Sequence, residues 1–92
     1  MLKLQISKRV HKFLIRLPAK HQNQLGLKIK QLRDNGHLSD SKLLKGSCWY
    51  RVDVGEYRLI YAIEDEALLI IPLVGKRNDD EVYKKLRRFD DS

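Results

Sequence analysis

The sequence has 92 residues, of which 42% are apolar, enough for one small hydrophobic core but not for two. No stretch reaches the roughly 20 apolar residues of a membrane-spanning helix, so we expect no membrane protein. The single cysteine excludes an internal disulfide and fits a reducing compartment. We therefore expect one cytoplasmic domain over residues 1–92, without a signal peptide.

The formal net charge is +7, and it is unevenly placed along the chain. The first 51 residues contain twelve Lys or Arg and two Asp or Glu, whereas the remaining residues contain seven and ten. A basic domain this small is a candidate for binding a polyanion such as a nucleic acid. A solvated surface that only aids solubility explains the same charge, and the charge alone does not separate the two interpretations.

The chain begins with a pattern typical of a strand followed by a helix. Apolar and polar residues alternate over residues 2–6, which predicts a short strand with one buried face. Ser7 suits the N-cap of a helix over residues 8–17, because its hydroxyl can accept an unpaired N–H of the first turn. The basic residues of this helix fall mainly on its outer face.

A second helix is predicted over residues 18–34. Pro18 ends the first helix and suits the first position of the next, where its missing N–H costs nothing. Asn35-Gly36 provides a left-handed stop. The inward-facing residues of this helix recur at helical spacing and are Leu25, Ile29 and Leu32. The two helices are expected to form a hairpin on one face of a sheet.

Three apolar runs follow, at residues 49–54, 57–63 and 67–74, and two short turns join them. This pattern predicts an antiparallel meander. The last run is apolar almost throughout, so we expect its strand to be central or covered on both faces. Pro72 lacks an N–H for the ladder, which predicts a bulge or an unpaired side near the end of that strand.

Two further segments frame the meander. Residues 37–48 show no periodicity, and we expect a loop from which Leu43 or Leu44 reaches the core. Asn78 with Glu81 three residues later resembles a capping box, which predicts a C-terminal helix. The expected order is βααβββα, an α+β fold with a small antiparallel-rich sheet, a helical hairpin packed on it and a C-terminal helix.

The residue types offer no metal or cofactor chemistry. Cys48 has no partner cysteine, and His11, His21 and His37 lack the spacing of metal ligands. We expect His11 and His21 to face solvent on helices and His37 to lie in a loop. No phosphate-binding loop and no nucleophile elbow occurs, so we expect neither a metal nor a cofactor.

The candidate chemistry is cationic and aromatic. Arg58 on a strand, Arg77 at a strand end and Tyr83 on the last helix are predicted to face one groove. Arginine binds phosphate through two parallel hydrogen bonds, and tyrosine stacks on a base or bonds to a phosphate. RNA cleavage by in-line 2′-OH attack needs a proton acceptor, stabilisation of the phosphorane and a donor to the leaving oxygen. Taken one by one, these residues are explained better by ordinary structural roles. Arg58 would form a surface ion pair, Arg77 would lie near Asp80 or Glu81, and Tyr83 would be a rim residue of an amphipathic helix.

The motifs nevertheless resemble a known family. They are Tyr57-Arg58-Leu59-Ile60-Tyr61, an acidic turn, Val74-Gly75-Lys76-Arg77 and Glu81-Val82-Tyr83. In this order they are similar to the RelE family of the RelE/ParE toxin–antitoxin superfamily, and the resemblance covers nearly the whole chain. The first motif is shared across the superfamily, whereas the last two are more specific to the RelE branch. The resemblance implies a metal-independent endoribonuclease that cleaves mRNA in the ribosomal A site and halts translation.

The resemblance also implies roles for individual residues. Arg58 and Arg77 would bind and stabilise the reacting phosphate, and Tyr83 would stack on or orient the nucleotide. The family places a lysine near Asp53, where this sequence has none, which leaves the general base open. Arg51 and Asp53 are the nearest polar residues on that face, and an ion pair of Asp53 with Arg51 or Arg58 is the simpler interpretation. With Lys76 in the Gly-Lys-Arg motif, these residues are further candidates for binding the substrate.

The implied partners are a RelB-like antitoxin, the ribosome and mRNA, in a hetero-oligomeric toxin–antitoxin complex and with no membrane. The basic helices would then contact ribosomal RNA. Two alternatives keep the fold. One is a ParE-like toxin that poisons DNA gyrase, which the missing lysine favours. The other is a module that binds RNA or an antitoxin without catalysis.

Overall fold

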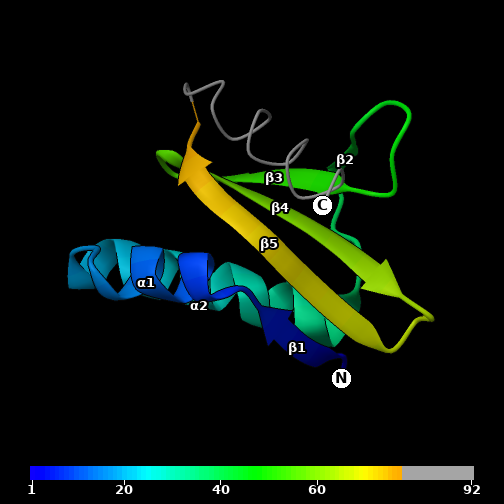
Figure 1. Ribbon diagram of the computed structural model, residues 1–92, viewed down its shortest axis with the longest axis horizontal. Helices are drawn as coiled ribbons and strands as arrows, with labels where there is room; N and C mark the ends of the chain where they lie inside the picture. Colours follow the sequence, from blue (N-terminus) through cyan, green and yellow to red (C-terminus); the bar gives the residue numbers. More distant parts are fainter. Residues whose placement is uncertain (78–92) are drawn as a thin grey trace.

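The computed structural model describes residues 1–77 as two helices and five strands (Figure 1). The helix expected after Asn78 lies outside the described residues. The elements are β1 (Lys3–Ile6), α1 (Lys8–Ile15), α2 (Ala19–Asn35), β2 (Lys42–Leu43), β3 (Tyr50–Val54), β4 (Tyr57–Glu64) and β5 (Leu68–Lys76).

The strands form one sheet in the order β1-β5-β4-β3-β2. The β3–β4–β5 meander is antiparallel, as the sequence predicts, and β1 adds to its free edge parallel to β5. Helices α1 and α2 lie side by side on one face of the sheet (Figure 1). The α+β class and the helical hairpin on the sheet are therefore confirmed.

The two faces of the sheet carry separate apolar clusters, because successive side chains of a strand point to opposite faces. On the helix side, Leu59 and Tyr61 of β4 pack with Leu25, Ile29 and Leu32 of α2 in the main core. On the other side, a smaller cluster is built from Trp49, Ile60, Ala62 and Leu73, with Leu44 packed against it. The expected inward stripe of α2 is thus confirmed, and Leu44, not the exposed Leu43, reaches the interior.

Pro72 causes the bulge that its sequence position predicts. The register shifts between Ile60 and Ala62 of β4, which pair with Leu73 and Ile70 of β5. One extra residue of β5 therefore stands opposite β4 at this point. Strand β5 is flanked by β1 and β4, so the expectation of a central strand is also confirmed.

Ser7 joins the start of α1 to this bulge. Its Oγ accepts from the N–H of Val10 at 3.1 Å and donates to the carbonyl of Pro72 at 3.0 Å. The predicted N-cap is therefore present, and it also ties α1 to a strand 65 residues away. The Ser7 hydroxyl therefore acts as both a donor and an acceptor. An alanine at this position could form neither hydrogen bond.

We expect Ser7→Ala to lower the free energy of unfolding by about 0.5–2 kcal/mol, the usual cost of losing an N-cap. Urea denaturation monitored by circular dichroism measures this change. Ser39→Ala, at an exposed turn position, is the matched control and is expected to stay close to the unsubstituted protein. Equal midpoints for the two variants would mean that neither hydrogen bond of Ser7 contributes to stability.

Several local expectations differ from the structure. Helix α1 ends at Ile15, two residues early, because the chain turns before Pro18. Leu4 of β1 is 37% exposed, since a four-residue edge strand leaves part of its apolar face uncovered. His21 is half-buried, with Nδ1 2.7 Å from the hydroxyl of Tyr57, and does not simply face solvent.

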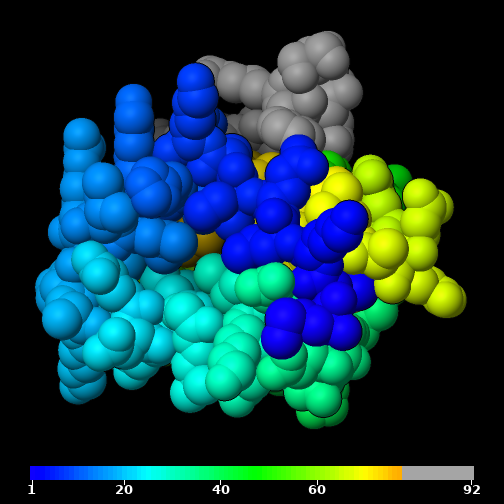
Figure 2. Space-filling model, turned by 90° about the horizontal axis from the view of Figure 1, so that it is seen from below, coloured from blue at the N-terminus to red at the C-terminus, as the bar shows by residue number. Residues whose placement is uncertain are grey.

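The helical face of the molecule carries the N-terminal positive charge. Seen from below in Figure 2, the blue-to-teal segments, which are β1, α1 and α2, fill this face, and long side chains stand out from it. The exposed cations of α1 and its C-cap are Lys8, Arg9, Lys12 and Arg16. Some cations of α2 are engaged within the fold: Lys28 pairs with Asp40, and Arg33 donates to the carbonyl of Leu2.

Candidate functional site: a cluster of arginines around Asp53

The β3–β4 hairpin determines which polar side chains meet. Its two-residue turn, Gly55-Glu56, pairs Val54 with Tyr57 and therefore Asp53 with Arg58. Gly55 adopts a positive φ of 58°, the conformation that such a tight turn needs. Directly opposite residues of two strands share a face, so Asp53 and Arg58 project together, away from the helices.

Asp53 and Arg58 form an ion pair through two hydrogen bonds. The Nε of Arg58 donates to Oδ1 at 2.8 Å, and Nη2 donates to Oδ2 at 3.4 Å. The arginine side chain is only 14% exposed, whereas the aspartate is 41% exposed. The guanidinium is therefore fixed in orientation by a carboxylate, as the simpler sequence interpretation anticipated.

The electrostatics of Asp53 argue against a role as a base near neutral pH. The hydrogen bond from Arg58 lowers the pKa of Asp53 below its ordinary value of 3.8, and the charges of Arg58, Arg51 and Arg77 act in the same direction. Partial burial acts in the opposite direction, but the net effect is a lowering. A carboxylate with a lowered pKa holds its charge and is a poor proton acceptor.

The charges of three arginines thus act on a single carboxylate. Arg51 lies two residues before Asp53 on the same face of β3, and the charge of Arg77 reaches Asp53 from the end of β5. The backbone N–H of Arg77 donates to the carbonyl of Glu56 at 2.9 Å, which anchors this residue at the hairpin turn. Its side chain is exposed. The cluster carries a net positive charge and is suited to an anion such as a phosphate.

One predicted site residue, Lys76, lies away from this cluster, and another falls outside the described residues. Lys76 pairs with Tyr57, whose ring packs on Phe13 and His21 on the helix side, so Lys76 lies on the face opposite Arg58. Tyr83 lies outside the described residues, and its place in the groove stays a prediction.

The sequence analysis missed the short strand β2, which enlarges the cluster. Lys42 of β2 pairs with Arg51 of β3. Lys42, Asp40, Arg51 and Asp53 line a small cavity of about 60 Å³. A two-residue strand has no detectable periodicity, so the sequence gives no signal for this contact.

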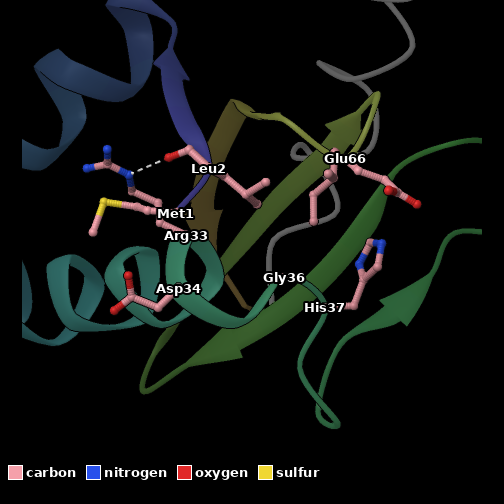
Figure 3. A pocket seen from close by; sticks show the side chains of 8 residues that line it. Met1, Leu2, Arg33, Asp34, Gly36, His37 and Glu66 are labelled. Carbon is pink, nitrogen blue, oxygen red and sulfur yellow. Dashed lines mark hydrogen bonds between the residues drawn. The ribbon is translucent and has the colours of Figure 1, made fainter.

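A larger cavity lies elsewhere on the molecule. It measures about 410 Å³ and lies beside the β4–β5 turn, at the opposite end of β4 from Arg58. In Figure 3, Arg33 extends toward the Leu2 carbonyl at one side, and His37 and Glu66 lie at the other. The nitrogen Nδ1 of His37 is also 3.0 Å from the hydroxyl of Tyr61. No predicted site residue lines this cavity, and its mixed lining indicates no particular chemistry.

Within residues 1–77, no group of three or more His, Cys, Asp or Glu side chains is arranged to hold a metal ion. In the same part of the chain, no helix is long and apolar enough to cross a membrane.

Comparison with solved structures identifies the architecture. A free mutant form of the E. coli toxin RelE superposes with a TM-score of 0.79 at 25% identity, over 95% of this chain and 96% of that one. The RelE of the Pyrococcus horikoshii RelE–RelB complex gives 0.75 at 25% identity, over 84% and 96%. The protein therefore has the fold of the RelE toxins.

The isolated E. coli RelE toxin agrees, with a TM-score of 0.73 at 24% identity over 98% of this chain and 99% of that one. No family model and no curated protein matches the sequence, so structural similarity carries the assignment. In the comparisons with the free and the isolated E. coli RelE, this chain and the RelE chain are each matched over almost their full lengths. The RelE fold, with the arginine cluster on the sheet face away from the helices, is the setting for the proposals below.

Proposed function

We propose that this protein is the toxin of a toxin–antitoxin system and that it cleaves mRNA on the ribosome by in-line attack of a 2′-OH. The fold supports the toxin assignment. The observation that carries the nuclease assignment is that Arg51 and Arg58 share one sheet face with Asp53, whose pKa the charge of Arg77 also lowers. Guanidinium groups so placed are suited to a phosphate whose charge grows in the transition state.

The proposed mechanism relies on charge stabilisation and positioning. Arg58, held by Asp53, would orient the reacting phosphate through a fixed guanidinium. Arg77, whose side chain is exposed, would stabilise the phosphorane and assist the leaving 5′ oxygen. Tyr83 would stack on or orient the nucleotide, as the resemblance implies. Asp53 is not assigned as the base, because its lowered pKa makes it a weak proton acceptor.

The helical face would provide the ribosome-binding surface. Arg9, Lys12 and Arg16 of α1, with Phe13 and Leu17, line a cavity of about 590 Å³. Cations beside an aromatic ring suit contacts with RNA phosphates and bases. This surface is made by the helices, whereas the arginine cluster lies on the other face of the sheet, so docking and chemistry would use different faces.

An antitoxin partner is part of the same proposal. Structurally similar RelE chains have been solved in complexes with RelB, from Pyrococcus horikoshii and from Methanococcus jannaschii. We propose that a RelB-like protein binds this chain in a hetero-oligomeric complex and blocks its toxicity. The protein would act in the cytoplasm, where ribosomes and mRNA are found.

One observation favours a second candidate. The position near which the resemblance implies a lysine is occupied by Asp53, and this aspartate is paired with Arg58. A ParE-like toxin that poisons DNA gyrase needs no nuclease site and would tolerate this arrangement.

Brief expression of this chain alone, followed by primer extension on cellular mRNA, separates the candidates. The nuclease proposal expects growth arrest with discrete cuts inside translated codons, and co-expression of the antitoxin should abolish both. Arrest with intact mRNA and gyrase-dependent DNA breaks would favour the ParE-like candidate. Absence of arrest and of cuts would contradict both toxin proposals.

The assignment of Asp53 makes a further prediction about pH. Because its folded-state pKa is lowered, Asp53 is ionised throughout the neutral range and loses its charge only in acid. We therefore expect Asp53→Asn to leave the shape of the pH–rate profile between about pH 6 and 9 unchanged, whatever its effect on the rate. Loss of an ionisation limb from the profile of this variant would identify Asp53 as the proton acceptor and contradict the proposed mechanism.

A further inference from the structure

A row of positively charged side chains extends from the proposed reaction centre across three strands of the sheet. Arg58 is on β4, Arg51 on β3 and Lys42 on β2, which are three successive strands. Lys42 lies directly opposite Arg51, and Asp53 lies directly opposite Arg58, so all four side chains share one face. With neighbouring strands about 4.8 Å apart, the row from β4 to β2 extends about 10 Å.

The carboxylates near Lys42 are already engaged by other cations. Asp40 accepts from the Nζ of Lys28 at 2.9 Å, and Asp53 accepts from Arg58. Within the described residues, no ion pair involves Lys42 or Arg51. Both side chains line the cavity of about 60 Å³ between β2 and β3. Asp40 and Asp53 line the same cavity, but each is paired with another cation, so Lys42 and Arg51 can bind a further anion.

We propose that Lys42 and Arg51 form a binding track for the backbone of single-stranded RNA, leading from Arg58 to the β2 edge of the sheet. The inference rests on the proposed function for its choice of RNA as ligand. An extended strand presents one phosphate per nucleotide, so a linear row of cations can bind a phosphate beside the reacting one. Lys42 makes a phosphate contact and has no part in the chemical step.

The shape of the track is the argument for a single strand over a duplex. The track is a narrow row that lies on the surface of a sheet, and it contains no helix or loop that would enter a groove. A contact to phosphate is also blind to base identity. Removal of Lys42 should accordingly weaken the binding of different sequences by the same factor.

The test uses the full chain and a short fluorescent 2′-O-methyl RNA, which lacks the attacking hydroxyl and cannot be cleaved by this route. Fluorescence anisotropy gives the affinity as a function of salt. Loss of one phosphate contact should reduce the slope of log K against log[salt] by about 0.7 in magnitude. The affinity lost on substitution should then be about fivefold greater at 0.1 M salt than at 1 M salt. We expect this change for Lys42→Ala with both a purine-rich and a pyrimidine-rich strand.

Lys3→Ala is the matched control, because Lys3 is an exposed lysine on β1, the opposite edge strand of the same sheet. Lys3→Ala removes the same charge as Lys42→Ala and should leave the salt dependence of binding unchanged. Lys42→Arg keeps the charge and should retain most of the affinity. Equal effects of Lys42→Ala and Lys3→Ala, or no binding by the unsubstituted chain at low salt, would overturn the track. Binding through Lys42 without cleavage of ribosome-bound mRNA would instead refute the nuclease proposal and leave the track in place.

Discussion

Arg77→Ala is expected to reduce the rate of mRNA cleavage by about 10²–10³-fold, the usual effect of removing one preorganised stabiliser of transition-state charge. Its positive charge, like those of Arg51 and Arg58, lowers the pKa of Asp53. Its side chain is exposed, and the fold uses only its backbone N–H, which donates to Glu56. An alanine keeps that N–H, so the loss of rate should come without a loss of stability.

Three controls make this result specific. Thermal unfolding of Arg77→Ala should match that of the unsubstituted chain, and binding to the antitoxin should be retained. Arg77→Lys keeps the charge but loses the planar fork, so we expect an intermediate rate. Lys3→Ala, which removes one charge at the far edge of the sheet, should cleave normally. Full toxicity of Arg77→Ala would end the proposed role of this residue.

Leu25→Ala is expected to lower the free energy of unfolding by about 2–5 kcal/mol, because it leaves a cavity in the main core. Leu25 is fully buried between α2 and the sheet. A domain of this size has a total stability of only about 5–15 kcal/mol, so the variant should be close to unfolding at physiological temperature. Chemical denaturation monitored by tryptophan fluorescence measures the change, since Trp49 is buried in the fold.

The same helix offers a matched control two residues away. Leu27 is 59% exposed and lies off the buried stripe, as the sequence pattern predicts. Leu27→Ala makes the same chemical change on the surface, where substitutions usually alter stability by no more than about 0.5 kcal/mol. If both variants lost the same stability, the docking of α2 on the sheet described above would be wrong.

Periodicity was sufficient to predict most of the architecture. The alternation in β4 and the two-residue turn at Gly55 place Arg58 on the face away from Leu59 and opposite Asp53, and the structure confirms that placement. The turn length also determines which arginine is the partner of Asp53. A two-residue turn fixes the register of the hairpin and places Arg58, not Arg51, directly across from Asp53. The sequence analysis named the pair without using this rule to choose between the two arginines.

Other features depend on contacts between distant parts of the chain. The parallel pairing of β1 with β5 joins residues 65 positions apart, and no local pattern indicates which strand receives β1. Lys42 meets Arg51 through a strand of only two residues, which is too short to show a period. The position of Lys76 depends on its register with Tyr57, which the Pro72 bulge makes hard to count from the sequence.

Cleavage of mRNA by the purified chain on ribosomes with a defined A-site codon tests the central claim most directly. One mRNA carries ordinary nucleotides in that codon and another carries 2′-O-methyl groups, which remove the proposed nucleophile. The proposal expects a single cut in the A-site codon of the first mRNA, no cut in the second, and no cut in either without ribosomes. Cleavage of the methylated codon, or no cleavage of the unmodified codon, would contradict it.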